Sequence, residues 1–144
     1  VTCHCLMKRR RAREYALQVL FQLDVTNNEF TDEVLKNFLK TIKEDDDVKE
    51  FANDIVTGTR KNIDSIDKII KKTAEHWAIN RIAVVDRNIL RAATYELLYR
   101  SDIPPSVVMN EAIEISKKFS TEDSASFING ILDKIQKSKI LSKK

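Results

Sequence analysis

The sequence predicts an all-α protein of about seven helices. Apolar residues recur at helical spacing along almost the whole chain, and the strict alternation typical of β-strands is hard to find. The 144 residues include only two glycines and two prolines, which favours helices joined by short loops. With 42% hydrophobic residues, a chain of this length can bury its own core without disulfides or a metal. The helices can form one compact unit or two small bundles divided near Asn62.

The first helix is predicted over residues 8–24. Successive residues of a helix are about 100° apart, so its small and branched apolar side chains fall on one narrow stripe. We expect this stripe to face the core. It consists of Ala12, Ala16, Val19, Leu20 and Leu23.

The second and third helices are predicted over residues 31–43 and 48–61. The acidic run at residues 44–47 separates them. We expect a solvated loop that places negative charge near the N-terminus of the third helix, where it is favoured, and we assign the run no function. The residues expected to face inward are Val34, Leu35, Phe38, Leu39, Ile42, Phe51, Ile55 and Thr59.

The fourth helix is predicted to start at Asn62 or Asp64, either of which can cap it, and to reach Glu75. The fifth, over residues 84–100, is apolar on more than one side, which is typical of a central helix with several neighbours. Glu96 falls on one of these apolar lines, so we expect it to be a buried carboxylate with a structural partner.

The last two helices follow Pro104 and Pro105, since proline disfavours helix at the preceding residue. The sixth is predicted over residues 106–119 and the seventh from the turn at residues 120–123 to about Lys137. Gly130 inside the seventh helix indicates a close approach of another helix. The inward-facing residues are expected to be Val108, Ala112, Ile115, Phe119, Ile128, Ile131, Leu132 and Ile135.

The two ends of the chain are predicted to lie outside the domain. We interpret residues 1–6 as an N-terminal extension or a remnant of cloning, with Met7 as the natural start. We expect one helical domain over residues 7–137 and a frayed basic tail over residues 138–144. Cys3, His4 and Cys5 could hold part of a zinc site, but no further cysteine completes it, so we predict no metal and no cofactor.

Positive charge is concentrated at the N-terminal end. The chain carries 25 basic and 22 acidic residues, a formal net charge of +3. Residues 1–14 hold five bases and one acid, a balance of +4, so the remaining residues sum to −1. This asymmetry predicts a binding surface for a polyanion, most simply a nucleic acid.

The first helix also carries an aromatic residue on its basic side. Arg10 and Phe21 lie about 20° apart around the helix, Leu17 lies between them and Arg13 lies at the edge of the same sector. Arginines can hold phosphates while an exposed aromatic ring stacks on a base. Packing of Phe21 against a neighbouring helix explains the pattern equally well. No groove-reading motif is present, so single-stranded nucleic acid is favoured.

Other classes of function find little support. No apolar run reaches the length of about 20 residues that spans a bilayer, and the start does not resemble a signal peptide, so we expect a cytoplasmic protein. There is no glycine-rich phosphate loop and no serine or cysteine with a histidine placed to activate it. His76 and Trp77 are better explained as packing residues. We therefore predict no enzymatic activity.

Several segments, taken together, resemble the transcription antitermination factor NusB family. The basic start is RRRARE at residues 9–14, and the central segments are WAINRIAVVDRNILR at residues 77–91 and ATYEL at residues 93–97. The last two helices contain NEAIEI at residues 110–115 and FINGILD at residues 127–133. The resemblance covers residues 7 to about 135.

The resemblance implies an all-helical fold of two small bundles and a role without catalysis. It implies binding of the single-stranded boxA element of nascent RNA together with NusE, a small-subunit ribosomal protein. The complex would help the RNA polymerase elongation complex read through terminators in ribosomal RNA operons. A homodimer that masks the basic helix until a partner arrives is one oligomeric state compatible with this role.

The resemblance also implies the site residues. The expected RNA-binding residues are Arg9, Arg10, Arg13 and Phe21 on the first helix, and Lys118, Phe119, Asp123 and Phe127 near the turn between the last two helices. Asp86 is the expected NusE contact. Packing of Phe119 and helix capping by Asp123 are equally good explanations for those two residues. Ser120 stands where relatives commonly have glycine, so the local turn is expected to differ.

Two alternative functions remain. The chain could be the RNA-binding domain of an rRNA cytosine methyltransferase, which would require a downstream cofactor-binding domain. It could also be a purely protein-binding helical adapter whose basic end is incidental. Titration of boxA RNA with and without NusE separates these hypotheses.

Overall fold

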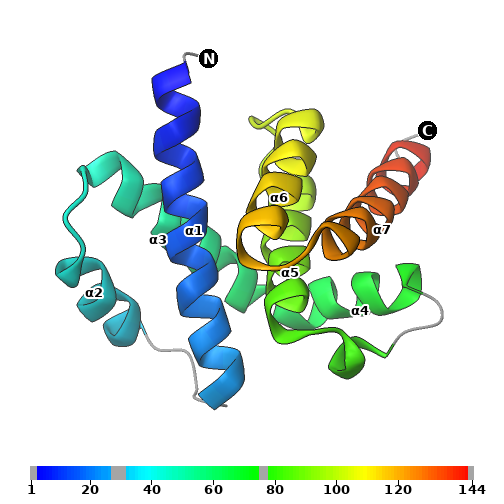
Figure 1. Cartoon of the computed structure of the whole chain (residues 1–144), viewed down its shortest axis with the longest axis horizontal. Coiled ribbons are helices and arrows are strands. Elements are labelled where there is room, and N and C mark those ends of the chain that lie inside the picture. Colours follow the sequence, from blue (N-terminus) through cyan, green and yellow to red (C-terminus); the bar gives the residue numbers. More distant parts are fainter. Residues whose placement is uncertain (1–2, 27–31, 75–77, 143–144) are drawn as a thin grey trace. The chain divides into compact units, whose positions relative to one another are not determined.

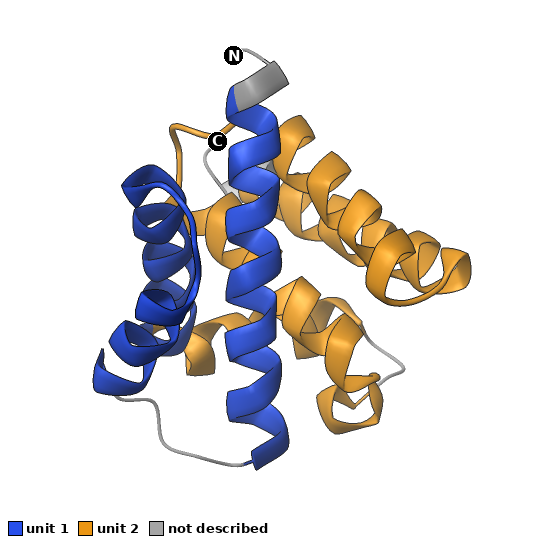
Figure 2. Cartoon of the chain, turned by 60° about the vertical axis from the view of Figure 1, so that its left-hand side comes forward, with its two compact units in different colours: residues 1–61 blue, residues 62–144 orange. Residues whose placement is uncertain are grey.

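A computed structural model describes residues 3–26, 32–74 and 78–142, and over these residues the chain forms seven α-helices, one 3₁₀ turn and no strand (Figure 1). The predicted all-α fold is confirmed. The chain divides into two compact units, Val1–Lys61 and Asn62–Lys144 (Figure 2). Of the two predicted arrangements, the structure therefore has the one with two small bundles divided near Asn62.

Unit 1 contains α1 (Cys3–Thr26), α2 (Asp32–Thr41) and α3 (Asp46–Lys61). α3 packs against both α1 and α2 (Figure 1). The predicted stripe of α1 is fully buried, which confirms that face as the core face. In α3 the predicted residues Phe51, Ile55 and Thr59 are buried.

Two predictions for unit 1 need correction. α1 is already helical at Cys3, upstream of the predicted start at Lys8. In α2 only Leu35 is buried, whereas Phe38 and Leu39 are half-buried and Val34 is exposed, because a short amphipathic helix buries only the line of side chains that faces its neighbours.

Unit 2 contains α4 (Ile63–Thr73), a 3₁₀ turn η1 (Ile79–Arg81), α5 (Val84–Tyr99), α6 (Pro105–Phe119) and α7 (Glu122–Ser142). α5 contacts α4, α6 and α7, so the predicted central helix is confirmed. Its buried residues include Glu96, which takes part in interactions within the fold. Pro105 is in the first turn of α6. A backbone N–H at this position has no partner within the helix, so proline costs the helix no hydrogen bond.

The C-terminal helix is longer than predicted. α7 continues to Ser142, beyond the predicted end at Lys137 and into the predicted tail. Lys139 donates a hydrogen bond to the carbonyl oxygen of Leu97, which ties this last part of α7 to the end of α5. The turn η1 was not predicted.

Some predictions fall on residues outside the described ranges. These are the helix ends at Thr31 and Glu75, together with His76 and Trp77. The side chains of Cys3 and His4 also lie outside the description. In the part of the chain that is described, no helix is long and apolar enough to cross a bilayer.

Candidate nucleic-acid interface

Part of the basic cluster on α1 is neutralised by the acids that precede α3. Glu44 accepts hydrogen bonds from Arg11 Nε at 2.9 Å and from the Tyr15 hydroxyl at 3.2 Å. Lys8 Nζ lies 2.8 Å from a carboxylate oxygen of Asp45. The solvated loop predicted for residues 44–47 is wrong at both ends, because Glu44 is largely buried and α3 already begins at Asp46. The positive charge of Arg11 on α1 compensates the Glu44 carboxylate and so allows it to be buried.

Two of the predicted RNA-binding arginines stack on one ring of α3. The guanidinium carbons of Arg9 and Arg13 lie 4.7 Å and 5.1 Å from the centre of the Phe51 ring. Such contacts are favourable because the face of an aromatic ring carries partial negative charge. Phe51 was predicted only as a core residue, and the sequence holds no signal that pairs it with these arginines.

The basic sector of α1 is less exposed than the helical wheel predicted. Arg13 is only 6% exposed, and Leu17 in the same sector is buried as well. Arg13, which was expected to face RNA, therefore does not lie at the surface, because α1 is buried over a wider arc than its predicted stripe. Arg9 and Arg10 are half-buried and Phe21 is 38% exposed, so these three remain accessible in part.

The second group of predicted residues lies at the end of α6. Phe119 is 40% exposed, so the alternative that it packs in the core is wrong. The ammonium group of Lys118 lies 5.3 Å from the centre of the Phe119 ring. The last turn of α6 therefore presents a cation and an aromatic ring to solvent.

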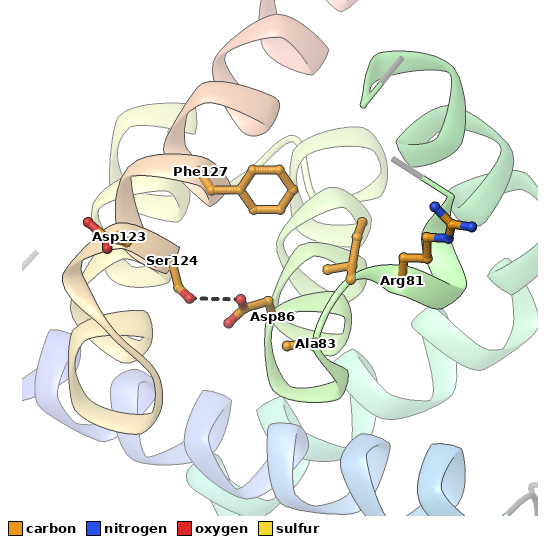
Figure 3. Close-up of a pocket in the computed structure, with 7 residues that line it drawn as sticks. Arg81, Ala83, Asp86, Asp123, Ser124 and Phe127 are labelled. Carbon is orange, nitrogen blue, oxygen red and sulfur yellow. Dashed lines mark hydrogen bonds between the residues drawn. The ribbon is translucent and has the colours of Figure 1, made fainter. Parts of the chain in front are cut away.

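The first turns of α7, the start of α5 and the segment before it line an open pocket of about 250 Å³. Figure 3 shows Ser124 of α7 pointing at Asp86 of α5 and the Phe127 ring extending across the pocket, while the Asp123 carboxylate and the Arg81 guanidinium point outward on opposite sides. The full lining is Arg81, Ile82, Ala83, Asp86, Asp123, Ser124 and Phe127. Two predicted RNA-binding residues and the predicted NusE contact thus line one pocket.

Asp86 is an unusual lining residue because it is a carboxylate with 6% exposure. One oxygen, Oδ2, accepts a hydrogen bond of 2.8 Å from the Ser124 hydroxyl. The other, Oδ1, is buried and accepts no hydrogen bond from the described residues. A buried acceptor without a donor costs free energy, so this carboxylate is held at a cost to the fold.

The turn before α7 holds Ser124 in place. Thr121 caps α7, since its hydroxyl accepts the Ser124 backbone N–H at 3.0 Å, and it also donates to Ser124 Oγ at 3.1 Å. The Ser120 hydroxyl donates to Ser124 Oγ at 3.0 Å. The side-chain cap of α7 is thus Thr121, while Asp123 lies in the first turn of α7, where negative charge stabilises a helix. Ser120, at the position where glycine was expected, joins this hydroxyl network.

Sequence reasoning missed Arg81 and Ser124 as lining residues. The turn predicted at residues 120–123 stops short of Ser124, and it gives no sign that Ser124 reaches a residue 38 positions away. The pocket offers a cation, an aromatic ring and a carboxylate acceptor, which together suit a planar, hydrogen-bonding group. Within the described residues, no group of three or more histidine, cysteine or acidic side chains is arranged to hold a metal ion.

Comparison with known proteins connects these features to a family. The family model described as "NusB family" matches residues 10–137. The transcription antitermination protein NusB of Thermodesulfovibrio yellowstonii is 48% identical over 96% of this chain and 97% of its own length. The protein of the same name from Desulforamulus reducens is 50% identical over 90% of each chain.

Solved structures agree with this match. NusB of T. maritima superposes with a TM-score of 0.81 at 42% identity and covers 90% of both chains. A crystal structure of the antitermination factors NusB and NusE in complex with dsRNA gives a TM-score of 0.80 at 33% identity, covering 92% of this chain and 98% of that one. The family match, the close relatives and the shared fold lead to one conclusion: this chain belongs to the NusB family.

Proposed function

We propose that this chain is a transcription antitermination factor. In this role it binds boxA RNA together with NusE and promotes readthrough by the RNA polymerase elongation complex, a binding role without catalysis. The main support is the pocket of unit 2, where Phe127, Arg81 and the buried Asp86 come together. The antitermination name of the relatives and the related complex with NusE and dsRNA support the choice of partners.

The residues of unit 1 take different parts in this proposal. Arg9 and Arg10 bind phosphates, and the partly exposed Phe21 stacks on a base. Arg13 is buried beneath this surface, so we assign it a supporting part, in which it holds the Phe51 ring against which Arg9 rests.

In unit 2, Lys118 binds a phosphate and Phe119 stacks on a base. Phe127 and Asp123 receive the RNA at the pocket, and Asp86 accepts a hydrogen bond from the protein partner.

Titration of fluorescein-labelled boxA RNA tests the proposal. We expect the chain to bind the single-stranded RNA and NusE to tighten that binding. The matching RNA duplex belongs in the same experiment, since the related complex contains dsRNA. Binding of NusE without binding of either RNA would instead establish a protein-binding adapter.

Phe127→Ala tests the pocket itself. Loss of a stacked base costs about 1–3 kcal/mol, so the RNA Kd should rise at least fivefold. Ser126→Ala is the matched control, because Ser126 is an exposed neighbour on α7 that does not line the pocket. Equal RNA affinities of the two variants would remove Phe127 from the site. Sedimentation velocity with and without RNA tests whether a homodimer covers the basic helix.

A further inference from the structure

Two neighbouring acids before α3 hold two bases of α1 in contacts of different strength. Glu44 receives Arg11 through Nε at 2.9 Å and Nη2 at 3.4 Å, and it receives the Tyr15 hydroxyl as well. The Glu44 side chain is only 12% exposed. Removal of Arg11 from this contact would leave a largely buried carboxylate without its cation, which is costly.

The contact between Lys8 and Asp45 is of the exposed kind. The two charged groups lie 2.8 Å apart; the Lys8 side chain is 23% exposed, and the Asp45 side chain is 65% exposed. Water can therefore solvate the carboxylate as soon as the ammonium group leaves, and ion pairs of this kind stabilise a fold little. The hydrogen bond to Asp45 raises the pKa of Lys8 above its ordinary value of 10.5, so Lys8 is charged at neutral pH.

We propose that Lys8 is a further RNA-binding residue, which exchanges Asp45 for a phosphate group while Glu44 keeps Arg11 in the fold. This inference rests on the proposed function. Lys8 adjoins Arg9 in the first part of α1, so RNA bound by Arg9 brings phosphates close to Lys8 at a high effective concentration. The exchange breaks one ion pair and forms one ion pair, which keeps its cost small.

The salt dependence of RNA binding measures this exchange. Each phosphate contact on a single strand contributes about 0.7 to the slope of log K against log salt. Lys8→Gln should therefore lower the slope by about 0.7 and weaken binding of labelled boxA RNA. Asp45→Asn should tighten binding about two- to fivefold, the range of an exposed ion pair, because Lys8 is then available without competition. Asparagine also keeps the ability to cap α3.

Asp46→Asn is the control for the change in net charge. Asp46 is the exposed next residue, and among the described residues it makes no ion pair with α1. We expect a clearly smaller effect from Asp46→Asn than from Asp45→Asn. We expect no tightening from Glu44→Gln beyond that of the control, together with a lower melting temperature.

Three results would overturn the inference. Equal effects of the Asp45 and Asp46 variants would show that only net charge matters. An unchanged slope for Lys8→Gln would show that Lys8 meets no phosphate. If the wild-type chain binds RNA normally, these two results contradict only the role of Lys8 and leave the proposed function intact. The third result, a wild-type chain that binds no RNA, would overturn both the role of Lys8 and the proposed function.

Discussion

Glu44 accepts hydrogen bonds from both Arg11 and Tyr15 while most of its side chain is shielded from water. Hydrogen bonds to charged groups are stronger than those between neutral groups. A single carboxylate thus joins two residues of α1 to the segment that leads into α3. Its sequence context, a run of four acids, suggested a solvated loop, since the pattern does not tell which acid turns inward.

Glu44→Gln should lower the free energy of unfolding by about 1–2 kcal/mol, because the charge-assisted bonds to Arg11 are weakened. Urea denaturation measures the loss. Glu50→Gln removes the same charge from an exposed position of α3 and should stay within about 0.5 kcal/mol of the wild type. Equal losses in the two variants would show that the contact of Glu44 adds nothing specific.

Tyr15 makes the stability depend on alkaline pH. Burial first, and then the nearby charge of Glu44, raises the pKa of Tyr15 above its ordinary value of 10.0. The folded state therefore holds the phenolic proton more tightly than the unfolded state does. The contribution of Tyr15 to the free energy of unfolding is fully present below pH 10, and it is lost as the pH rises through the pKa of Tyr15 in the folded state.

Tyr15→Phe should make this alkaline loss shallower, because it removes one of the groups that titrate. Denaturation curves at several values between about pH 9 and pH 11.5 measure the slope. The contribution of Lys8, whose pKa is also raised, has the same sign and should remain in the variant. A slope identical to that of the wild type would exclude Tyr15 as its source.

At the scale of elements, α7 shows what a residue's type can and cannot predict. Gly130 was expected to mark a close helix approach, but a Cβ atom placed there meets nothing within 4 Å. That prediction is wrong: Gly130 is exposed and none of the other described helices approaches it closely. Glycine in a helix costs about 0.5–1 kcal/mol relative to alanine.

Gly130→Ala should therefore stabilise the chain by about 0.5–1 kcal/mol through the lower backbone entropy of the unfolded state. Thermal unfolding followed by circular dichroism measures the rise in Tm. A lower Tm would mean that the added methyl group meets an obstacle, contrary to the open space around Gly130.

A buried arginine links α5 to α4. Arg91 binds both carboxylate oxygens of Asp67 at 2.8 Å, and it donates to the Asn88 side chain at 3.2 Å. Arg91 belonged to a segment that resembles the family, but neither its partner on α4 nor its burial was predicted. A helical wheel places a residue on a face and does not tell which residue of another helix it meets.

Arg91→Met should destabilise the chain by about 2–4 kcal/mol, because it leaves Asp67 without its cation in a partly buried place. Chemical denaturation measures the change. Lys137→Ala removes an exposed ion pair with Asp133 and should cost at most about 0.5 kcal/mol. A small loss for Arg91→Met would show that Asp67 rehydrates without difficulty.

For the whole molecule, the fold was largely predictable and the candidate site was predictable only in part. The spacing of apolar residues predicted the seven helices that the described residues form, because each helix is specified by the pattern within its own segment. The pocket joins Asp86 to Ser124 across 38 positions, and no local pattern encodes such a contact. The exposure of Phe119 and the burial of Arg13 likewise depend on neighbours that a single helical wheel leaves out.

The position of charge, rather than its total, should decide RNA binding by the whole chain. Reversal of Arg9 and Arg10 to glutamate should weaken binding of boxA RNA by a factor of ten or more, since phosphate contacts become repulsive. Reversal of Lys71 and Lys72, two exposed residues at the end of α4, changes net charge by the same amount. This second variant should bind RNA nearly as well as the wild type, and equal losses would assign the effect to net charge alone.

The shared lining of the pocket has a thermodynamic consequence. Asp86, the proposed contact of the protein partner, and Phe127, a proposed RNA contact, lie on its two sides. Occupation by one ligand therefore changes the surface that the other ligand meets. Any factor by which NusE tightens RNA binding must equal the factor by which RNA tightens NusE binding, because both paths of the cycle end in the same ternary complex.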